Sequence, residues 1–458
     1  MVDSRLSGRH LADMLTKFLK FFSTEQKQSN IKIDRNLDQS LISPSALKVI
    51  SGLQNGGFSA YLVGGGIRDI LLGGTPKDFD VATNATPEEV KKLFRSAVII
   101  GRRFRIVHVR FGREIIEVTT FRAHHEDASH SHEAKQAESG MLLRDNVYGD
   151  IGSDAVRRDF TVNALYYDPR EDELLDFTDG LDDLDRRLLR IIGDPEKRYR
   201  EDPVRMLRAV RFSAKLGFQM EPATAAPITE LGELLSHIPP ARLFEEVLKL
   251  MLNGSATATL ELLRHCDLFQ YLFPGTDFCL RHASTQEKKL IEQVVVNTDK
   301  RIRQSKRVTP AFIYAAFLWL PLQAATRKNM SDLKLPPQQA MQQAANGVVG
   351  QQLSATAIPK RFLMPMREIW SLQFRLPRRE GNKAYALMEH PRFRAAYDFL
   401  LLREESGEDM NGLGAWWTRF QNADDKKREL MIQDLGEPPK KRRPRKRKRK
   451  PSQPQGEQ

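Results

Sequence analysis

The sequence predicts an α+β protein in which a mixed α/β head with a small sheet is followed by an all-helical neck and body and a disordered basic tail. Three observations predict this order. Short strand-like segments alternate with helical ones up to about residue 190. Helical patterns without strands continue from there to about residue 425. The chain then ends in a segment too rich in Pro, Lys and Arg to build a core.

The length of the chain predicts several domains. At 458 residues it is too long for one ordinary core, so we expect two to four domains. Shifts in composition divide it into an N-terminal extension, a head, a neck, a body and a tail, at residues 1–42, 43–190, 191–255, 256–425 and 426–458.

Composition and charge narrow the class of protein. The longest apolar run, Ala311–Leu320, is shorter than the roughly 20 residues that cross a membrane, and it predicts a core helix ending before Pro321. The net charge is +13, and ten positive charges fall between Lys440 and Lys450. Affinity for a polyanion is therefore concentrated in the tail. The two cysteines are too few for a disulfide scaffold, which favours a reducing, cytoplasmic setting.

The N-terminal extension carries one amphipathic pattern. Apolar residues recur at helical spacing, with Lys17 and Lys20 beside them. Asp13 and Lys20 interrupt the apolar stretch, so a signal peptide is not expected. Two interpretations stay open, a helix that docks on its own protein and a helix that binds a partner or a membrane surface. The stripe consists of Leu11, Met14, Leu15, Phe18, Leu19 and Phe22.

The stretch Tyr61–Asp80 carries the strongest chemical signal. A strand at Ala60–Val63 runs into three glycines, and a second strand is expected to carry Asp78 and Asp80. Side chains alternate along a strand, so these two carboxylates share a face, where a divalent cation would relieve their repulsion. Glycine lets backbone N–H groups approach an anion closely. The pattern therefore predicts a site for a nucleoside triphosphate with Mg²⁺, although no Walker loop is present.

Two later segments bear on the metal site. In the expected strand Glu114–Phe121, Ile116 and Val118 face the core, which puts Glu117 on the opposite face as a third metal carboxylate. Glu114 lies next to a turn and is expected to be solvated. Four histidines follow in a polar segment that favours a flexible loop over a metal cluster, namely His124, His125, His130 and His132.

An ordered set of motifs resembles the class II nucleotidyltransferases, the superfamily of bacterial poly(A) polymerases and tRNA CCA-adding enzymes. The motifs span residues 61 to about 250, and the likeness to the poly(A) polymerases continues to about residue 400. They read GGGIRD, KDFD, IIEVTTFR, RRDFTVNALYY and EDPVRMLRAVRF. The resemblance implies two Mg²⁺ ions (Mn²⁺ as an alternative) on Asp78, Asp80 and Glu117. It also implies phosphate binding by Gly64, Gly65 and Arg68.

The resemblance assigns the nucleotide contacts as well. It implies that Arg158 pairs with a phosphate and Asp159 accepts from a ribose hydroxyl, in front of an expected strand at Phe160–Tyr167. Asp202 and Arg205 match the base-reading element of the family. The presence of Asp202 can also be explained without any function, as the cap of a helix that ends at Gly217. On another face of that helix Arg208, Arg211 and Lys215 suit phosphates or RNA.

The expected reaction is template-independent addition of AMP from ATP to RNA 3′ ends, which promotes RNA turnover. A tRNA CCA-adding enzyme is the close alternative, and a non-catalytic RNA-binding protein is one of another class. The segment GRRFRIVHV and the basic tail favour the polymerase.

RNA-decay proteins or the membrane surface are further candidate partners, through the N-terminal helix or the tail. The helical body is expected to bind RNA, although its residues offer no readable chemistry, and Gln338–Gln352 suggests a loose connection. The tail residues expected to bind RNA are Lys440, Lys441, Arg442, Arg443, Arg445 and Lys446.

Overall fold

A computed structural model describes residues 31–33, 37–101, 105–123, 134–136, 142–145 and 148–435. The chain forms two compact units. The first contains the residues up to Pro239 together with Ala258–Tyr271, and the second contains Pro240–Thr257 and the residues from Leu272 onward. The N-terminal apolar stripe, the four histidines and the basic tail lie outside the described residues.

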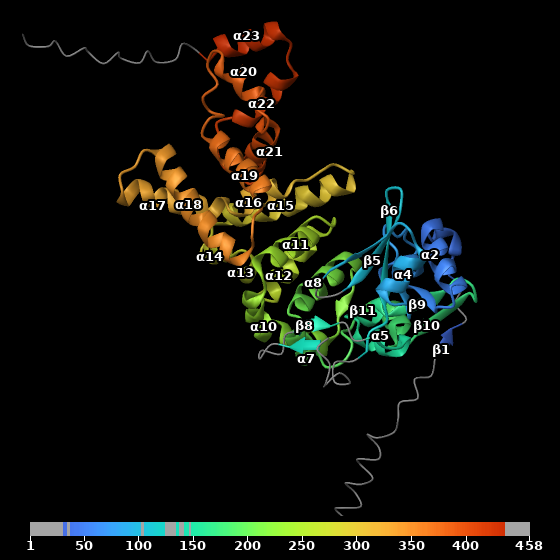
Figure 1. Ribbon diagram of the computed structural model, residues 1–458. Coiled ribbons are helices and arrows are strands. Elements are labelled where there is room, and N and C mark those ends of the chain that lie inside the picture. The colour runs from blue at the N-terminus through green and yellow to red at the C-terminus, as the bar shows by residue number, and fades with distance from the viewer. Residues whose placement is uncertain are drawn as a thin grey trace, which may run out of the picture. The chain divides into compact units, whose positions relative to one another are not determined.

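The first unit is built on a mixed sheet, as predicted, but the sheet is larger than expected (Figure 1). Residues 31–33, from the N-terminal extension, form one edge of the sheet by pairing with Glu173–Asp176. Only one neighbouring pair in this sheet is parallel, that between β3 and β6. In spatial order the eight strands are β1 (Ile31–Ile33), β10 (Glu173–Asp176), β9 (Leu165–Asp168), β2 (Ala60–Val63), β3 (Asp80–Thr83), β6 (Glu114–Thr120), β5 (Ile106–Phe111) and β4 (Ala97–Ile100).

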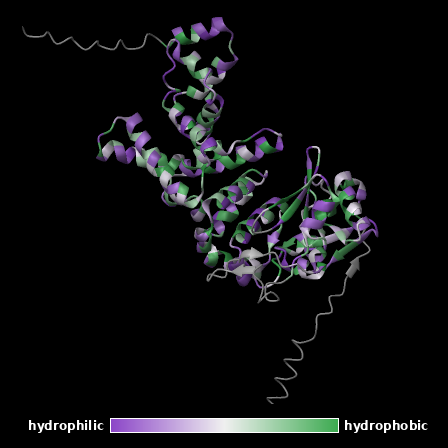
Figure 2. Ribbon diagram, viewed as in Figure 1, coloured by the Kyte–Doolittle hydropathy of each residue, from purple (hydrophilic) through white to green (hydrophobic). Residues whose placement is uncertain are grey.

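Alternating apolar residues place the core of this unit against the sheet. Figure 2 shows hydrophobic residues concentrated on the strands of the sheet. One buried cluster combines Val63, Ala82, Phe121 and Tyr166 with residues of neighbouring elements. The flanking helices begin at caps. Ser43 accepts from the N–H of Ser45 at the start of α2 (Pro44–Asn55), and a reciprocal capping box starts α4 (Pro87–Leu93). The other helices of the head are α3 (Gly65–Leu71), α5 (Ile151–Arg157) and α6 (Gly180–Arg186).

Two strand predictions are wrong in detail. Asp78 precedes β3 instead of lying on it, because the strand begins at Asp80. The expected strand Phe160–Tyr167 starts as a 3₁₀ turn, η3 (Thr161–Asn163), and becomes β9 only at Leu165. The Thr161 hydroxyl donates to the buried carboxylate of Asp183 at 2.6 Å, a contact 22 residues away that sequence alternation cannot anticipate.

The neck helices follow the head. In α8 (Val204–Leu216) the apolar face is buried, and Gly217 ends the helix in the left-handed region with φ 67°. Strands do not end at about residue 190 as predicted, because the two-residue strand β12 (Gln219–Met220) pairs in parallel with β11 (Leu188–Leu189). The short helices of this region are α7 (Pro195–Glu201), α9 (Pro222–Ala225), α10 (Pro227–Leu231) and η4 (Gly232–His237).

The second unit is helical in its described part, which confirms the predicted fold class. Gln338–Gln352 is part of a regular helix instead of a loose connection, because Ala344, Val348 and neighbouring apolar residues are buried on one of its faces. The apolar run ends as a helix at Phe317, and Pro321 lies in the first turn of the next helix. Among the described residues, no helix is long and apolar enough to cross a membrane.

The helices of this unit are amphipathic, and several bury large aromatic side chains. Trp417 and Phe420 lie in one cluster with Leu400 and Phe393. The helices are α11 (Pro240–Met251), α14 (Pro274–Arg281), α15 (Thr285–Arg303), α16 (Pro310–Phe317), α17 (Trp319–Asp332), α18 (Pro337–Ala355), α19 (Lys360–Gln373), α20 (Lys383–Met388), α21 (Phe393–Glu405), α22 (Leu413–Asn422) and α23 (Asp425–Gln433), while α12 (Ala256–His265) and α13 (Phe269–Leu272) contain residues of both units.

Candidate active site

The parallel strands β3 and β6 place two of the predicted metal carboxylates side by side. Asp80 and Glu117 are register partners across this pair. Ile116 and Val118 are buried, as predicted, so Glu117 lies on the opposite face of β6. His108 of β5 is the next register partner, with its Nε2 atom 3.7 Å from Oε2 of Glu117. Glu114 is exposed, also as predicted.

The electrostatics of Asp80 indicate that negative charge is crowded at this point. The pKa of Asp80 is raised to about 6, first by desolvation and then by the charge of Glu117, with Asp78 adding to the effect and Arg158 opposing it. Asp80 as a residue retains solvent-exposed area, yet the protein atoms around its carboxylate withdraw water from it. A bound cation would relieve both the poor solvation and the repulsion.

The donor set suits a divalent cation, although its side chains are not gathered around one point. Among the described residues, no three carboxylate, imidazole or thiol side chains are placed to hold a metal ion as they stand. The oxygen chemistry of Asp78, Asp80 and Glu117 is nevertheless what Mg²⁺ and Mn²⁺ prefer. The raised pKa of Asp80, which desolvation and then the charge of Glu117 produce, also fits a divalent cation.

Gly64 keeps the space between the carboxylates and the arginines open. Its backbone has φ 80° and ψ −138°, a conformation that L side chains rarely adopt. A Cβ atom at Gly64 would lie 3.8 Å from Nη1 of Arg158 and 4.0 Å from Oδ2 of Asp80. The glycine therefore leaves free the space between a cationic group and an anionic one, where a metal-bound phosphate would fit. A Cβ atom at Gly65 would lie 3.3 Å from Nη2 of Arg68.

Arg68 is placed differently from the prediction. Its side chain is buried, with only 2% of the residue exposed, so it cannot reach a phosphate without moving. Its Nε donates to Oδ1 of Asp69 at 2.9 Å, and its Nη1 donates to the side chain of Asn163. This arrangement favours a positioning role, in which Arg68 ties the glycine turn to η3.

Arg158 faces the site from the end of α5. Its Nε donates to the hydroxyl of Tyr166 at 2.8 Å, and its Nη2 donates to Asp154 at 3.0 Å. These bonds hold the guanidinium with Nη1 toward Gly64 and Asp80. Of the residues predicted to bind phosphate, Arg158 is therefore the one whose guanidinium is already oriented toward Gly64 and Asp80.

The carboxylate of Asp159 forms an ion pair with a residue of the neck. It accepts from Nε of Arg208 at 2.7 Å and from Nδ2 of Asn163 at 3.2 Å. These bonds outweigh burial and lower its pKa to about 2. Both carboxylate oxygens are therefore used within the protein, because the other oxygen also accepts from the N–H of Phe160. A contact with a ribose would compete with these bonds.

The sequence did not predict the cluster of arginines that lies beside Arg158. Arg198 of α7 donates from Nη2 to the backbone carbonyls of Arg157 and Arg158, at 2.5 and 2.6 Å. Burial, followed by repulsion from Arg122, Arg198 and Arg205, lowers the pKa of Arg157 to about 9. Such crowded cationic charge suits a polyanionic ligand. The RR pair of the motif could have indicated Arg157 as part of this cluster. Arg198 could be assigned to it only from the fold.

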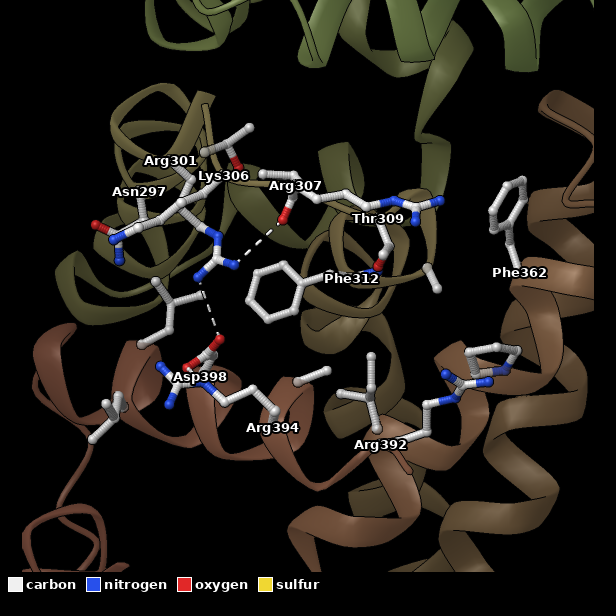
Figure 3. Close-up of a pocket in the computed structure, with 18 of the residues that line it drawn as sticks. Asn297, Arg301, Lys306, Arg307, Thr309, Phe312, Phe362, Arg392, Arg394 and Asp398 are labelled. Carbon is white, nitrogen blue, oxygen red and sulfur yellow. Dashed lines mark hydrogen bonds and ion pairs between the residues drawn. The ribbon is translucent and has the colours of Figure 1, made fainter. Parts of the chain in front are cut away.

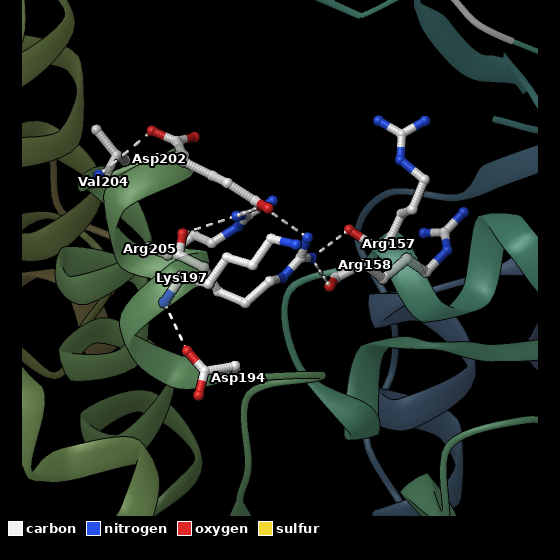
Figure 4. Close-up of polar contacts among 9 residues, drawn as sticks. Arg157, Arg158, Asp194, Lys197, Asp202, Val204 and Arg205 are labelled. Carbon is white, nitrogen blue, oxygen red and sulfur yellow. Dashed lines mark hydrogen bonds and ion pairs between the residues drawn. The ribbon is translucent and has the colours of Figure 1, made fainter. Parts of the chain in front are cut away.

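The predicted base-reading pair lies where α7 meets α8. The carboxylate of Asp202 accepts from the N–H of Val204 at 3.3 Å, as a cap would, although the helix begins one residue later than expected. Arg205 donates from Nη1 to Glu201 at 2.9 Å and to the carbonyl of Arg198 at 2.8 Å. Figure 4 shows Asp202 and Arg205 on this junction. Asp202 remains partly exposed.

The basic face of α8 points partly toward the head instead of toward solvent. Arg208 pairs with Asp159, and Nζ of Lys215 lies 3.7 Å from Oδ2 of Asp69. Arg211 lies over the ring of Phe212, with Cζ 4.7 Å from the ring centre. RNA binding by this face stays a prediction, and Arg208 would have to release Asp159 to contact a phosphate.

Known proteins match this chain along most of its length. A family model described as the poly A polymerase head domain matches residues 60–190. The poly(A) polymerase I of Salmonella typhimurium is 49% identical over 413 residues, which cover 89% of each chain. The chain belongs to the poly(A) polymerase I family. Two further models match this poly(A) polymerase, the probable RNA- and SrmB-binding site of polymerase A at 217–280 and the polymerase A arginine-rich C-terminus at 333–451.

CCA-adding enzymes are more distant relatives of this poly(A) polymerase. The CCA-adding enzyme of Lactobacillus helveticus is 38% identical over 220 residues, 48% of this chain and 52% of its own. A solved structure of a CCA-adding enzyme in an apo form has a TM-score of 0.58 at 18% identity, and it covers 89% of this chain and 91% of its own. The latter likeness shows a shared fold.

Proposed function

We propose that this poly(A) polymerase adds AMP residues from ATP to RNA 3′ ends without a template and releases pyrophosphate. The match to poly(A) polymerase I along 89% of both chains carries the proposal. The site supports it, because Asp80 and Glu117 are register partners beside an open glycine turn and a cluster of arginines. Family membership makes the chain a polynucleotide adenylyltransferase, with RNA and ATP as its substrates.

The residues that would hold metal ions are Asp78, Asp80 and Glu117. When bound, two Mg²⁺ ions, or Mn²⁺ in their place, would supply the positive charge that activates the RNA 3′-hydroxyl and offsets the charge of the leaving pyrophosphate. The chain itself aligns the reactants. Gly64 admits the triphosphate close to its backbone, and Arg158 pairs with a phosphate oxygen through Nη1.

The arginine network keeps Arg158 in place during this alignment. Arg198 fixes the carbonyls of Arg157 and Arg158 from α7, and Asp154 with Tyr166 fixes the guanidinium of Arg158. Arg68 stabilises the glycine turn through its hydrogen bonds to Asp69 and Asn163. Gly65 contacts the same triphosphate through its backbone N–H, and its lack of a side chain leaves room for Arg68. Asp159 contributes by holding Arg208 and accepts from the ribose only when that ion pair loosens.

Asp202 and Arg205 select the base. The Asp202 carboxylate accepts from the exocyclic amine of adenine, while Arg205 donates to the neighbouring ring acceptor. Guanine and uracil carry a carbonyl where this amine should be, which would leave polar groups unpaired. Glu201 and the carbonyl of Arg198 orient Arg205 for this contact.

RNA binding extends beyond the catalytic residues in this proposal. Arg211 and Lys215 of α8 and the basic tail bind RNA phosphates, and the tail and the N-terminal stripe are candidate sites for RNA-decay proteins or a membrane surface. Both cysteines of the chain, Cys266 and Cys279, are free, which agrees with a cytoplasmic location.

One assay tests the proposed reaction. The pure protein is incubated with a short oligo(A) and each nucleoside triphosphate separately, and the products are sized. Long ladders with ATP alone are the expected result. Addition of only C, C and A to a truncated tRNA would replace the proposal with a CCA-adding activity. Binding without extension of any primer would show a non-catalytic RNA-binding protein.

A further inference from the structure

The second unit contains a groove with a volume of about 620 Å³ that no part of the proposed reaction uses. It is lined by the C-terminal part of α15, the loop from Gln304 to Thr309, and residues of α16, α19 and α21. All these elements belong to the same compact unit. Figure 3 shows the groove with the residues that line it.

The groove carries a surplus of positive charge. Seven Lys and Arg side chains line it, against the two carboxylates of Asp398 and Glu405. Asp398 is already shared by two arginines, at 3.5 Å from Nη1 of Arg301 and 3.0 Å from Nε of Arg394. Figure 3 shows Arg301 directed toward Asp398 and toward the carbonyl of Arg307, which it contacts at 3.3 Å. The negative charge of Asp398 is thus neutralised by two arginines of the lining.

Three other cations of the lining keep their charge available. Within the described part of the chain, no carboxylate lies within ion-pair distance of Lys306, Arg307 or Arg361. All three side chains belong to exposed residues. Lys306 and Arg307 stand on the loop between α15 and α16, which the bond from Arg301 to the Arg307 carbonyl fixes. An anion in the groove would meet cations that have no carboxylate partner to displace.

Aromatic side chains form another part of the lining. Phe312 and Phe362 are both half-buried, so part of each ring faces the groove. Phe312 is held edge-on by Phe399, with ring centres 6.2 Å apart. The guanidinium of Arg361 lies over the Phe362 ring at 4.9 Å. Fixed aromatic faces beside unpaired cations are the combination that binds single-stranded nucleic acid, because bases stack while phosphates pair.

We infer that this groove binds one or two nucleotides of single-stranded RNA upstream of the growing 3′ end, with the phosphates on Lys306, Arg307 and Arg361 and a base against Phe312 or Phe362. The inference rests on the proposed function for the identity of the RNA as the strand being extended. A free nucleotide is the poorer occupant, because an open groove lets a chain pass and its lining contains no glycine turn for a triphosphate. An acidic protein segment would use the cations but leave the rings unused.

The experiment compares two double variants of the full chain that each lose two positive charges. The groove variant is Lys306→Gln with Arg307→Gln. The control is Lys288→Gln with Lys289→Gln, two exposed residues at the start of α15 that do not line the groove. Binding to a fluorescent oligo(A) is measured across a salt series, and AMP incorporation is measured at saturating RNA. The groove variant should bind roughly tenfold more weakly at low salt, with a salt slope shallower by about 1.4.

The control should keep the affinity and slope of the wild type, and both variants should keep the incorporation rate at saturating RNA. Equal losses in the two variants would show diffuse attraction and overturn the inference, as would no loss in either. Tighter binding of polyglutamate than of oligo(A), lost in the groove variant, would assign the groove to an acidic protein and also overturn it. Failure of the wild type to extend any primer would overturn the proposed function, while the binding data would still judge the groove.

A photo-crosslink locates the nucleotides. Oligo(A) molecules carrying a single 8-azidoadenosine at successive positions are irradiated with the protein, and the labelled peptides are identified. Peptides containing Phe312 or Phe362 should be labelled from one or two adjacent upstream positions and not from the 3′-terminal one. Phe312→Leu, which keeps an apolar side chain against Phe399, should weaken this label. Labelling of the groove by 8-azido-ATP alone would overturn the inference in favour of a nucleotide site.

Discussion

Asp80 and Glu117 are direct register partners on β3 and β6, the single parallel pair in the described sheet of the head. A parallel pair requires a crossover, and here α4, β4 and β5 lie between the two strands in the chain. The crossover brings two carboxylates 37 positions apart in the sequence to the same level of the sheet. The charge of Glu117 adds to desolvation in raising the pKa of Asp80.

Asp80→Asn should abolish AMP incorporation and leave RNA affinity nearly unchanged, because it neutralises a proposed metal ligand without altering the basic surfaces. The matched control is Glu114→Gln on β6, whose carboxylate is exposed and accepts from Ser43 outside the site. It should retain most of the activity. Primer extension and filter binding measure the two properties. Near wild-type extension by Asp80→Asn would disprove the metal assignment.

The affinity of the site for Mg²⁺ should depend on pH below neutrality. Asp80 titrates with a pKa of about 6 in the metal-free protein, so below this pH a proton must leave before a metal binds. The apparent affinity should be flat above about pH 7 and fall roughly tenfold per unit well below pH 6. Calorimetric titration with Mg²⁺ at about pH 5, 6 and 8 measures this. Equal affinity at the extremes would contradict the assignment of Asp80.

Asp202→Asn should lower the use of ATP and relax discrimination against the other nucleotides. Asparagine still caps a helix, so the helix start is preserved while the hydrogen-bond pattern offered to the base changes. Asp194→Asn is the matched control, because Asp194 caps α7 by accepting from the N–H of Lys197 at 2.8 Å (Figure 4). Kinetics with all four nucleotides compare the two variants. Unchanged selectivity in Asp202→Asn would remove this residue from base reading.

Arg208→Gln should destabilise the protein more than Lys215→Gln, although both residues stand on α8 and both pair with a head carboxylate. The Arg208–Asp159 pair is partly buried and its loss should cost about 1–2 kcal/mol, whereas the exposed Lys215–Asp69 pair should contribute less than about 0.5 kcal/mol. Urea unfolding measures both. Equal stability of the two variants would show that the Arg208 pair is not a structural link.

The pH dependence of this pair has a defined sign. Arg208 depresses the pKa of Asp159 to about 2, so the pair's contribution to the free energy of unfolding is present above the unfolded-state pKa near 4. It is lost as the pH falls through about 2. The difference between the wild type and Arg208→Gln should therefore be constant from about pH 8 to pH 5. A difference that changes over this range would point to another group.

Removal of the tail should weaken RNA binding without slowing catalysis at saturating RNA. A chain ending at Glu437 loses the ten positive charges between Lys440 and Lys450. If about half of them bind phosphates, the salt slope should become shallower by about 3, with the largest loss of affinity at low salt. Binding across a salt series measures this. Parallel lines of equal affinity would show that the tail does not tether RNA.

The sequence by itself determined the features that depend on local periodicity. Alternation around Ile116 and Val118 assigned Glu117 to the opposite face of its strand, and Gly217 marked the end of the helix that carries Arg205. These signals act over a few residues, where backbone geometry leaves few choices. Ordered motifs added the family and the reaction, because each motif carries its own chemistry.

Only the tertiary structure decided which partner each charged side chain meets. Arg68 was expected on a phosphate but is buried against Asn163, which lies 95 residues away, and Arg208 was expected on RNA but holds Asp159. An arginine reaches in several directions from its Cα atom, and its partner depends on elements far away in the sequence. The link from Arg198 to the carbonyl of Arg158 and the groove beside Phe312 have the same origin. Both arise from packing between distant segments, which no local pattern encodes.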